Sequence, residues 1–183
     1  MSVERKSMLS KYSQITQIQT LKKIIKTYKL KKETRVSTFK SLEILKNYGI
    51  PLAKYGLAKN LTQAKKLAKT VGYPLVLKVS SSKIVHKTDV GGVIVGIKDE
   101  QELKRKWEIL MASLQTHNVI DDIEGVVVMR QILDTERQFV VGTIYGGEGI
   151  GNSLMFGLGG IFVETLKEVG FIDCPINLVG LEK

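Results

Sequence analysis

The stretch LVLKVSSSKIVHKTDVGGVIVGI, from Leu75 to Ile97, places two apolar runs on either side of a charged segment that ends in paired glycines. The first run, Leu75–Ser80, shows little alternation of apolar and polar residues, which is typical of a strand covered on both faces. The second run, Gly92–Ile97, is rich in β-branched residues, which favour strands. We therefore predict that the two runs are paired strands joined by the loop between them.

Lys78 lies inside the first of these predicted strands. Burying its ammonium group requires an anionic partner, because an unpaired buried charge is strongly unfavourable. A lysine at the edge of a strand that points into solvent is the more common alternative. The non-alternating run around Lys78 and the glycine-containing loop after it favour an anion-binding lysine.

The loop between the runs, His86–Gly92 (HKTDVGG), has two explanations. Gly91 and Gly92 permit positive φ angles and a close approach, so successive backbone N–H groups can face phosphate oxygens. Lys87 would add charge there and Thr88 a hydroxyl group. A simple hairpin turn explains the same glycines, and both explanations stay open on these residues alone.

Two further side chains could carry chemistry. Four roles are open for His86: a phosphate ligand, a general base, a nucleophile for phosphoryl transfer, or a structural histidine of the loop. Glu164, at the end of the apolar run GGIFVE, could hold Mg²⁺ against substrate phosphates, or it is an ordinary glutamate at a strand end. His117 has no supporting residues nearby and is expected on the surface. Two histidines and one cysteine at these separations make a zinc site improbable.

Hydrophobic periodicity and capping residues predict the remaining elements. Helices are expected over 13–32, 38–47, 62–70 and 99–114, and further strands over 53–58, 125–133 and 137–146. The last two strands are close enough in sequence to form a hairpin. The order of elements, first rich in helices and later in strands, favours an α+β architecture over a doubly wound parallel sheet.

The charge of the chain is its most unusual bulk property. The 183 residues carry a formal net charge of +10, much of it in the segments LKKIIKTYKLKKETR and AKNLTQAKKLAK, which suggests anionic partners. The helix expected over 13–32 is amphipathic, with lysines on its polar face. A membrane or RNA could bind it, but a helix that packs on protein with its lysines in solvent is the preferred interpretation. Nucleic acid is therefore not the expected partner.

The sequence also predicts the cellular compartment of the protein. A single cysteine, Cys174, excludes an intrachain disulfide. The N-terminus lacks the apolar core of a secretory signal, and no apolar run approaches the ~20 residues that cross a bilayer. We expect a cytoplasmic protein without a membrane partner.

Several segments together resemble a known family. The segments EILKNYGIPL, GYPLVLKVSSSKIVHKTDVGGVIVGIKDEQEL, IEGVVVMRQIL, RQFVVG and LMFGLGGIFVETLKEV follow the order found in the ATP-grasp subunit of NDP-forming (ADP-forming) acyl-CoA synthetases of the acetate–CoA ligase type. The resemblance covers roughly 37–169. It implies an acid–thiol ligase, related to succinyl-CoA synthetase, that converts acyl-CoA, ADP and phosphate to acid, CoA and ATP through phosphohistidines.

The resemblance also implies roles for individual residues. By this similarity His86 is the catalytic phosphoryl carrier, Glu164 binds Mg²⁺, and nucleotide is bound by Lys78, Lys87, Thr88, Gly91, Gly92 and the hinge residues Met129, Arg130 and Ile132. The cofactors would be ATP or ADP with Mg²⁺, and a separate CoA-binding α-type subunit would complete the enzyme. The implied fold has two mixed lobes, with a basic helical extension over 1–36, a first lobe over 37–124 and a second lobe over 125–183.

The chain departs from the family pattern at several positions. Arg130 stands where relatives have a glutamate that accepts a hydrogen bond from adenine, and an arginine cannot accept one. Gln138 also replaces a glutamate, and Ile172 stands where an arginine is expected. The second lobe is expected to be truncated at its C-terminal end, and the isolated chain to show little ligase activity. A non-catalytic ATP-grasp module that binds a partner or a polyanion is the alternative.

Overall fold

The computed structural model describes residues 26, 35–133, 138–146, 151–159 and 169–174. The chain divides into two compact units, Met1–Gln131 and Ile132–Lys183. The described part of the first unit contains a four-stranded sheet with helices, and that of the second contains a three-stranded sheet. Both sheets are antiparallel, which agrees with the predicted α+β class.

The sheet of the first unit has the strand order β1-β4-β2-β3. Its strands are β1 (Tyr55–Ala58), β4 (Gly125–Arg130), β2 (Leu75–Ser80) and β3 (Val93–Ile97). Every neighbouring pair is antiparallel, so β1 runs parallel to β2 with β4 between them, and β3 runs parallel to β4 with β2 between them. The sheet therefore consists of two interlocked crossover units, and one strand of each lies between the two strands of the other.

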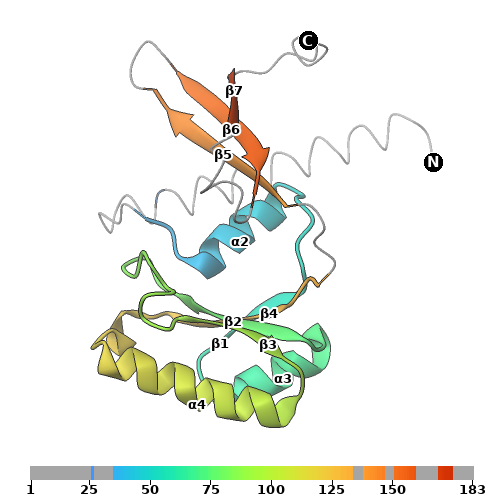
Figure 1. Ribbon diagram of the computed structural model, residues 1–183, viewed down its shortest axis with the longest axis vertical. Coiled ribbons are helices and arrows are strands. Elements are labelled where there is room, and N and C mark those ends of the chain that lie inside the picture. Colours follow the sequence, from blue (N-terminus) through green and yellow to red (C-terminus); the bar gives the residue numbers. More distant parts are fainter. Residues whose placement is uncertain (1–25, 27–34, 134–137, 147–150, 160–168, 175–183) are drawn as a thin grey trace, which may run out of the picture. The chain divides into compact units, whose positions relative to one another are not determined.

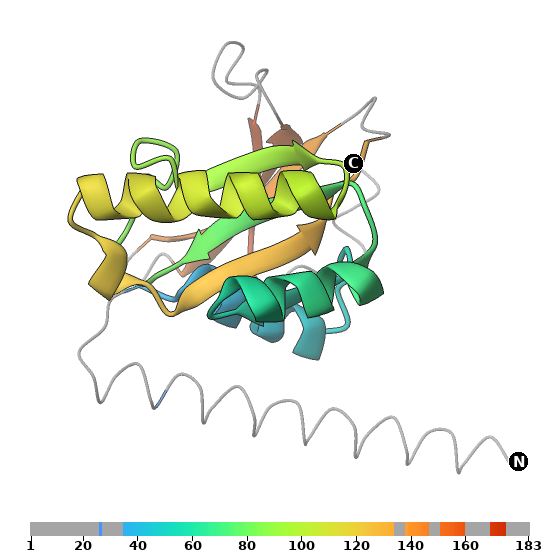
Figure 2. The same ribbon diagram turned by 90° about the horizontal axis from the view of Figure 1, so that it is seen from below.

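The helices α3 (Leu61–Val71) and α4 (Glu100–Thr116) make the two crossovers and cover one face of this sheet (Figures 1 and 2). Helix α3 packs against β1 and β4, and α4 packs against β3. Both helices begin within one residue of their predicted starts, and the side chains of Asn60 and Asp99 cap them by accepting hydrogen bonds from Gln63 N and Glu102 N. Among the described residues, no helix is long and apolar enough to cross a membrane.

Strand β2 divides its side chains between two environments. Leu75, Leu77 and Val79 are fully buried and belong to the core under α3 and α4. Because side chains alternate along a strand, Val76, Lys78 and Ser80 face the other way. Val76 and Ser80 are also buried, so β2 is covered at both ends of its second face, as its non-alternating sequence predicts.

Helix α2 (Thr38–Asn47) lies on this second face of the sheet (Figure 1). Its N-terminus is held by a polar network at the ends of β2 and β4. The Ser80 hydroxyl accepts a hydrogen bond from Phe39 N at 3.0 Å and donates one to Glu124 Oε2 at 3.3 Å, while the Ser37 hydroxyl donates to the same carboxylate at 2.6 Å. Both serines are 0% exposed, so these hydrogen bonds satisfy groups that water cannot reach.

A second contact joins α2 to β1. The hydroxyl of Tyr55 donates a hydrogen bond to Glu43 Oε1 at 2.7 Å. Burial of the ring, the hydrogen bond and the negative charge of Glu43 together raise the pKa of Tyr55 to about 12. The neutral phenol is therefore the form that holds α2 against β1.

The second unit contains β5 (Phe139–Tyr145), β6 (Asn152–Leu158) and β7 (Val169–Asp173), paired in that order. Its described residues are strands only, and several of its large apolar side chains are exposed, among them Phe139 at 69%.

The structure corrects two expectations about chain organisation. The hairpin predicted between 125–133 and 137–146 is wrong, because β4 pairs with β1 and β2 whereas β5 pairs with β6. Strand β4, assigned from sequence to the second lobe, lies inside the first sheet, so the two units divide after Gln131 instead of after residue 124. The helix expected over 13–32 lies outside the described residues, apart from Lys26.

The polar network predicts the effect of replacing Ser80. In Ser80→Ala the half-buried N–H of Phe39 loses its acceptor, which should lower the free energy of unfolding by about 1 kcal/mol. Urea unfolding followed by the fluorescence of Trp107, the single tryptophan, would measure this change. Ser82→Ala is the matched control, since Ser82 makes no hydrogen bond with the described residues. Equal stability of the two variants would contradict the proposed role of Ser80.

The Glu43–Tyr55 contact predicts a pH effect. In Glu43→Gln the pKa of Tyr55 should fall from about 12 toward its ordinary value of 10, because the carboxylate acceptor and its charge are gone. In the parent chain the pKa is raised on folding, so the contact stabilises fully below pH 10 and is lost as the pH rises through about 12. NMR titration of ¹³C-labelled tyrosine rings, with Tyr55→Phe for assignment, measures both values. An unchanged Tyr55 titration in Glu43→Gln would show that the contact has no such effect.

Candidate functional site

Lys78 lies in the middle of the sheet, directly opposite Val93 on β3 and Val127 on β4. Its side chain is half-buried on the face turned away from α3 and α4. No residue that the structure describes forms a hydrogen bond or ion pair with it. A half-buried ammonium group without a protein partner is well suited to an anionic ligand.

The loop after β2 returns to the sheet beside this lysine. Val79 N donates a hydrogen bond to Gly92 O at 2.8 Å, so the end of the loop is joined to β2 next to Lys78. Inside the loop, Gly92 N donates to Lys87 O at 2.6 Å and Gly91 N to Thr88 O at 3.0 Å. The loop is therefore a compact turn closed by its own backbone.

These hydrogen bonds modify the interpretation of the paired glycines. The sequence suggested that the N–H groups of Gly91 and Gly92 face a phosphate, but in this structure both N–H groups bond to carbonyls of the same loop. Gly91 has φ +62°, and a Cβ atom there would lie 2.6 Å from Ser113 Oγ. Close packing against α4 and a left-handed backbone thus explain this glycine. Whether either glycine also binds nucleotide stays a prediction.

The first half of the loop is held by Ser81, which the sequence analysis did not single out. Its hydroxyl donates to Asp122 O at 2.7 Å and accepts from Lys83 N and Ile84 N at 3.0 and 3.1 Å. A serine whose hydroxyl accepts from N–H groups two and three residues later is a recognisable local turn. The run SSSK was the signal that could have revealed it.

His86 is exposed between these two anchored ends of the loop. A cavity of about 360 Å³ adjoins the loop and is lined by Arg35, Val36, Ser41, Ser81, Ser82, Ile84, Val85 and Lys87. Its charged lining residues, Arg35 and Lys87, are both cationic. The Lys87 ammonium group donates to Ile84 O at 3.3 Å, which holds it on this side of the loop. The cavity beside the loop therefore favours an anion.

The predicted hinge residues are separated by the structure. Met129 shares the face of Lys78, because Val127 lies opposite Lys78 and side chains alternate along β4. Arg130 points to the other face, where its guanidinium lies beside Gly72 at the end of α3. Gln131 closes the strand, accepting a hydrogen bond from Gly96 N at 2.7 Å.

Two predicted site residues lie outside the described part of the first unit. Ile132 is exposed and belongs to the second unit. Glu164 lies outside the described residues. No cluster of three or more histidine, cysteine or acidic side chains that could hold a metal occurs among the described residues. The Mg²⁺ site therefore stays a prediction. His117 is exposed at the end of α4, as predicted.

Comparison with known proteins relates this geometry to a family. The ATP-grasp domain, as a sequence family, matches residues 27–182. The chain belongs to the ATP-grasp family. Within it, the chain is homologous to the β subunits of ADP-forming acetate–CoA ligases. It is 41% identical to the ligase I subunit beta of Pyrococcus furiosus over 135 residues, which are 74% of this chain and 57% of that protein.

Two other relatives support the same placement. The ligase II subunit beta of P. furiosus is 37% identical over 155 residues, which are 85% of this chain and 65% of that protein. A solved structure of the Ca. Korarchaeum cryptofilum dinucleotide-forming acetyl-coenzyme A synthetase 1, in complex with coenzyme A, Ca-AMPCP and HgCl⁺, matches with a TM-score of 0.71 at 30% identity, covering 82% of this chain and 66% of that one. This ATP-grasp chain thus spans 57–66% of the lengths of these relatives.

Because the loop His86–Gly92 packs on α4, substitutions at two glycines should have different effects on stability. Gly91→Ala should lower the free energy of unfolding by more than the ~1 kcal/mol expected from positive φ alone, because the new methyl group meets Ser113. Gly96→Ala is the matched control, since Gly96 has φ +70° but nothing within 4 Å of an added Cβ. Urea unfolding gives both values.

A second substitution tests the cause. Ser113→Ala removes the nearest atom, so it should restore part of the stability lost in Gly91→Ala and none of that lost in Gly96→Ala. Equal losses at the two glycines, or a Ser113 effect at both, would contradict the packing explanation.

Proposed function

We propose that this chain is the nucleotide-binding ATP-grasp part of an ADP-forming acyl-CoA synthetase. The observation that carries the proposal is Lys78, a half-buried cation without a partner among the described residues, next to the loop that bears His86. In this proposal its ammonium group binds the phosphates of ATP or ADP. Such a charge-assisted contact is among the stronger polar interactions in proteins.

The phosphoryl group is proposed to pass through His86. In the direction of ATP formation, a ring nitrogen of His86 attacks a phosphoryl group carried on a phosphohistidine of the proposed partner subunit, so that the new N–P bond forms as the donor's N–P bond breaks and the donor imidazole is released. The new bond then breaks as a terminal oxygen of ADP attacks phosphorus, which yields ATP and the free imidazole of His86. The exposed position of His86 and the cations Arg35 and Lys87 beside the loop suit an anionic group that arrives and leaves.

The hinge is proposed to bind adenine mainly through its backbone and Met129. The resemblance implies that Arg130 stands where the family pattern has a glutamate, but the side chain of Arg130 lies on the face opposite Lys78. We therefore do not expect its guanidinium to touch a nucleotide bound over Lys78. The loss of the glutamate would weaken adenine recognition without blocking it.

The rest of the reaction requires groups beyond these residues. The relatives are named as β subunits of ADP-forming acetate–CoA ligases, so we propose a CoA-binding α-type subunit as the partner and acetyl-CoA, ADP and phosphate as substrates. Mg²⁺ would neutralise charge on the phosphates when bound, and Glu164 is the residue proposed to hold it. The cytoplasm is the proposed compartment.

Nucleotide binding tests the role of Lys78 directly. Isothermal titration of the chain with Mg-ADP and Mg-ATP should show binding that Lys78→Met weakens by about tenfold or more, because a charge-assisted contact to phosphate is lost. Lys104→Met, on the exposed side of α4, is the matched control and should leave affinity unchanged. No heat with either nucleotide in the parent chain would favour the non-catalytic module instead.

The two histidines provide a test of the phosphoryl carrier. Incubation with Mg-[γ-³²P]ATP should label the chain with phosphate that is labile in acid and stable in base, as phosphohistidine is. His86→Gln should abolish the label, and His117→Gln should retain it, since His117 lies outside the loop, at the C-cap of α4, where its Nδ1 is 2.8 Å from Ser113 O. Labelling that survives in His86→Gln would exclude His86 as the carrier.

A further inference from the structure

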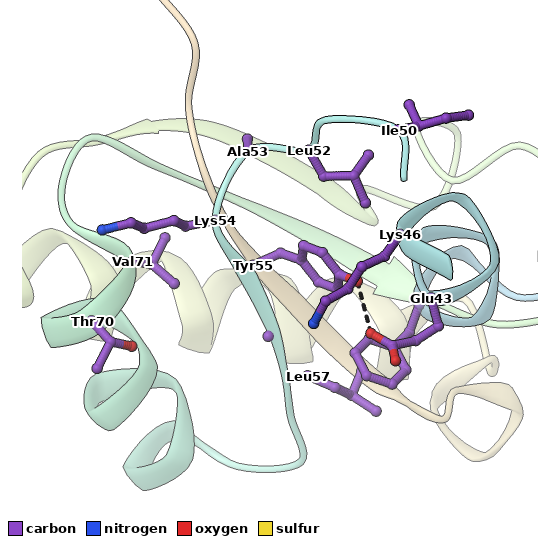
Figure 3. Close-up of a pocket in the computed structure, with 12 residues that line it drawn as sticks. Glu43, Lys46, Ile50, Leu52, Ala53, Lys54, Tyr55, Leu57, Thr70 and Val71 are labelled. Carbon is purple, nitrogen blue, oxygen red and sulfur yellow. Dashed lines mark hydrogen bonds between the residues drawn. The ribbon is translucent and has the colours of Figure 1, made fainter. Parts of the chain in front are cut away.

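A groove runs along the open edge of the first sheet, between α2 and α3 (Figure 3). It has a volume of about 590 Å³. The residues that line it, called the edge groove below, come from α2, the segment before β1, β1 itself and the end of α3: Phe39, Glu43, Lys46, Ile50, Leu52, Ala53, Lys54, Tyr55, Gly56, Leu57, Thr70 and Val71. It lies at β1, at the opposite edge of the sheet from β3.

Strand β1 presents unpaired backbone groups to this groove. Arg130 N donates a hydrogen bond to Lys54 O at 2.8 Å, which identifies Lys54 and Arg130 as a hydrogen-bonded pair of β1 and β4. Because hydrogen-bonded and non-hydrogen-bonded pairs alternate, the N–H and C=O groups of Tyr55 and Leu57 point away from β4. None of them bonds to another described residue.

The other edge of the same sheet is closed. The Lys106 ammonium group lies 3.0 Å from Val95 O and 3.5 Å from Gly96 O. The pairing of β3 is also irregular opposite Leu75–Leu77. Proteins commonly block sheet edges in these ways to prevent unwanted strand pairing. At the edge formed by β1, the pairing with β4 is regular and no described side chain bonds to the outward backbone groups of Tyr55 and Leu57.

The walls of the edge groove combine apolar surface with positive charge. Its apolar side chains include Phe39, Leu57 and Val71. Lys46 extends from α2 over the groove, and Lys54 extends toward α3 on the other side (Figure 3). Neither lysine forms an ion pair with a described residue. The one acidic lining residue, Glu43, accepts the hydrogen bond of Tyr55.

We propose that the edge groove binds an extended acidic peptide segment of a partner protein, which adds to the sheet as a fifth strand beside β1. Its backbone pairs with Tyr55 and Leu57, its alternate side chains lie against the walls formed by α2 and α3, and its carboxylates meet Lys46 and Lys54. A second copy of this chain is a poor occupant, because pairing two β1 strands would bring the lysines of both copies together on chains of net charge +10.

The test uses a fluorescent seven-residue peptide of alternating valine and threonine with an aspartate at each end, titrated into the full chain and followed by anisotropy. We expect saturable binding. The same peptide with lysines in place of the aspartates should bind about fivefold more weakly or worse, because two favourable charge contacts become repulsive. Equal binding of the two peptides would contradict the charge argument, and absence of binding would overturn the proposal.

Backbone methylation distinguishes strand addition from other binding modes. An added strand pairs through the N–H and C=O groups of only one of its two edges. Two peptides, each methylated at one of the two alternating sets of N–H groups, should therefore differ: one should bind about tenfold more weakly or worse, and the other should bind almost unchanged. Equal effects of the two methylation patterns would mean that the peptide does not pair with β1.

Variants of the chain locate the site. Lys46→Gln with Lys54→Gln should weaken binding of the acidic peptide about fivefold and reduce its salt dependence. Lys66→Gln with Lys104→Gln removes equal charge outside the edge groove and should leave affinity unchanged. Equal loss in both pairs would mean that the peptide responds to net charge alone. A dimer in sedimentation equilibrium that the acidic peptide fails to dissociate would identify a second copy as the occupant instead.

Discussion

The burial of β2 on both faces is the constraint on which the rest of the structure depends. One set of its side chains, Leu75, Leu77 and Val79, completes the core beneath α3 and α4. The alternate set ends in Ser80, which anchors α2, and has Lys78 at its centre. A shift of register by one residue would place Lys78 in the apolar core, so stability and the position of the ammonium group are fixed by the same pairing.

The loop that carries His86 follows from this arrangement. Ser81 holds its start and the Gly92–Val79 hydrogen bond holds its end, so an exposed histidine is presented from a segment with two fixed ends. Glu124 links the same region to α2 through Ser37 and Ser80. The lysine, the loop and the helix are therefore positioned by the ends of two adjacent strands, which is how a rigid sheet supports a functional loop.

Much of the first unit could be predicted from local sequence. The predictions that failed have a common cause. The span Thr38–Asn47, the starts of α3 and α4 to within one residue, and the pairing of β2 with β3 depend on neighbouring residues, and all were predicted. The hairpin of β4 with β5 was wrong because proximity in sequence was taken as proximity in the sheet. The unbroken run Val126–Val128 is buried, and like β2 it indicated a central strand.

Hydrogen exchange of the full chain, measured by mass spectrometry with and without Mg-ADP, tests most directly that the second face of β2 is the nucleotide site. The account predicts slower exchange in β2, in the loop that follows it and at the end of β4, because a nucleotide on Lys78 would cover these segments. Protection confined to the α3 and α4 side of the sheet, or none in β2 and its loop under saturating nucleotide, would contradict it.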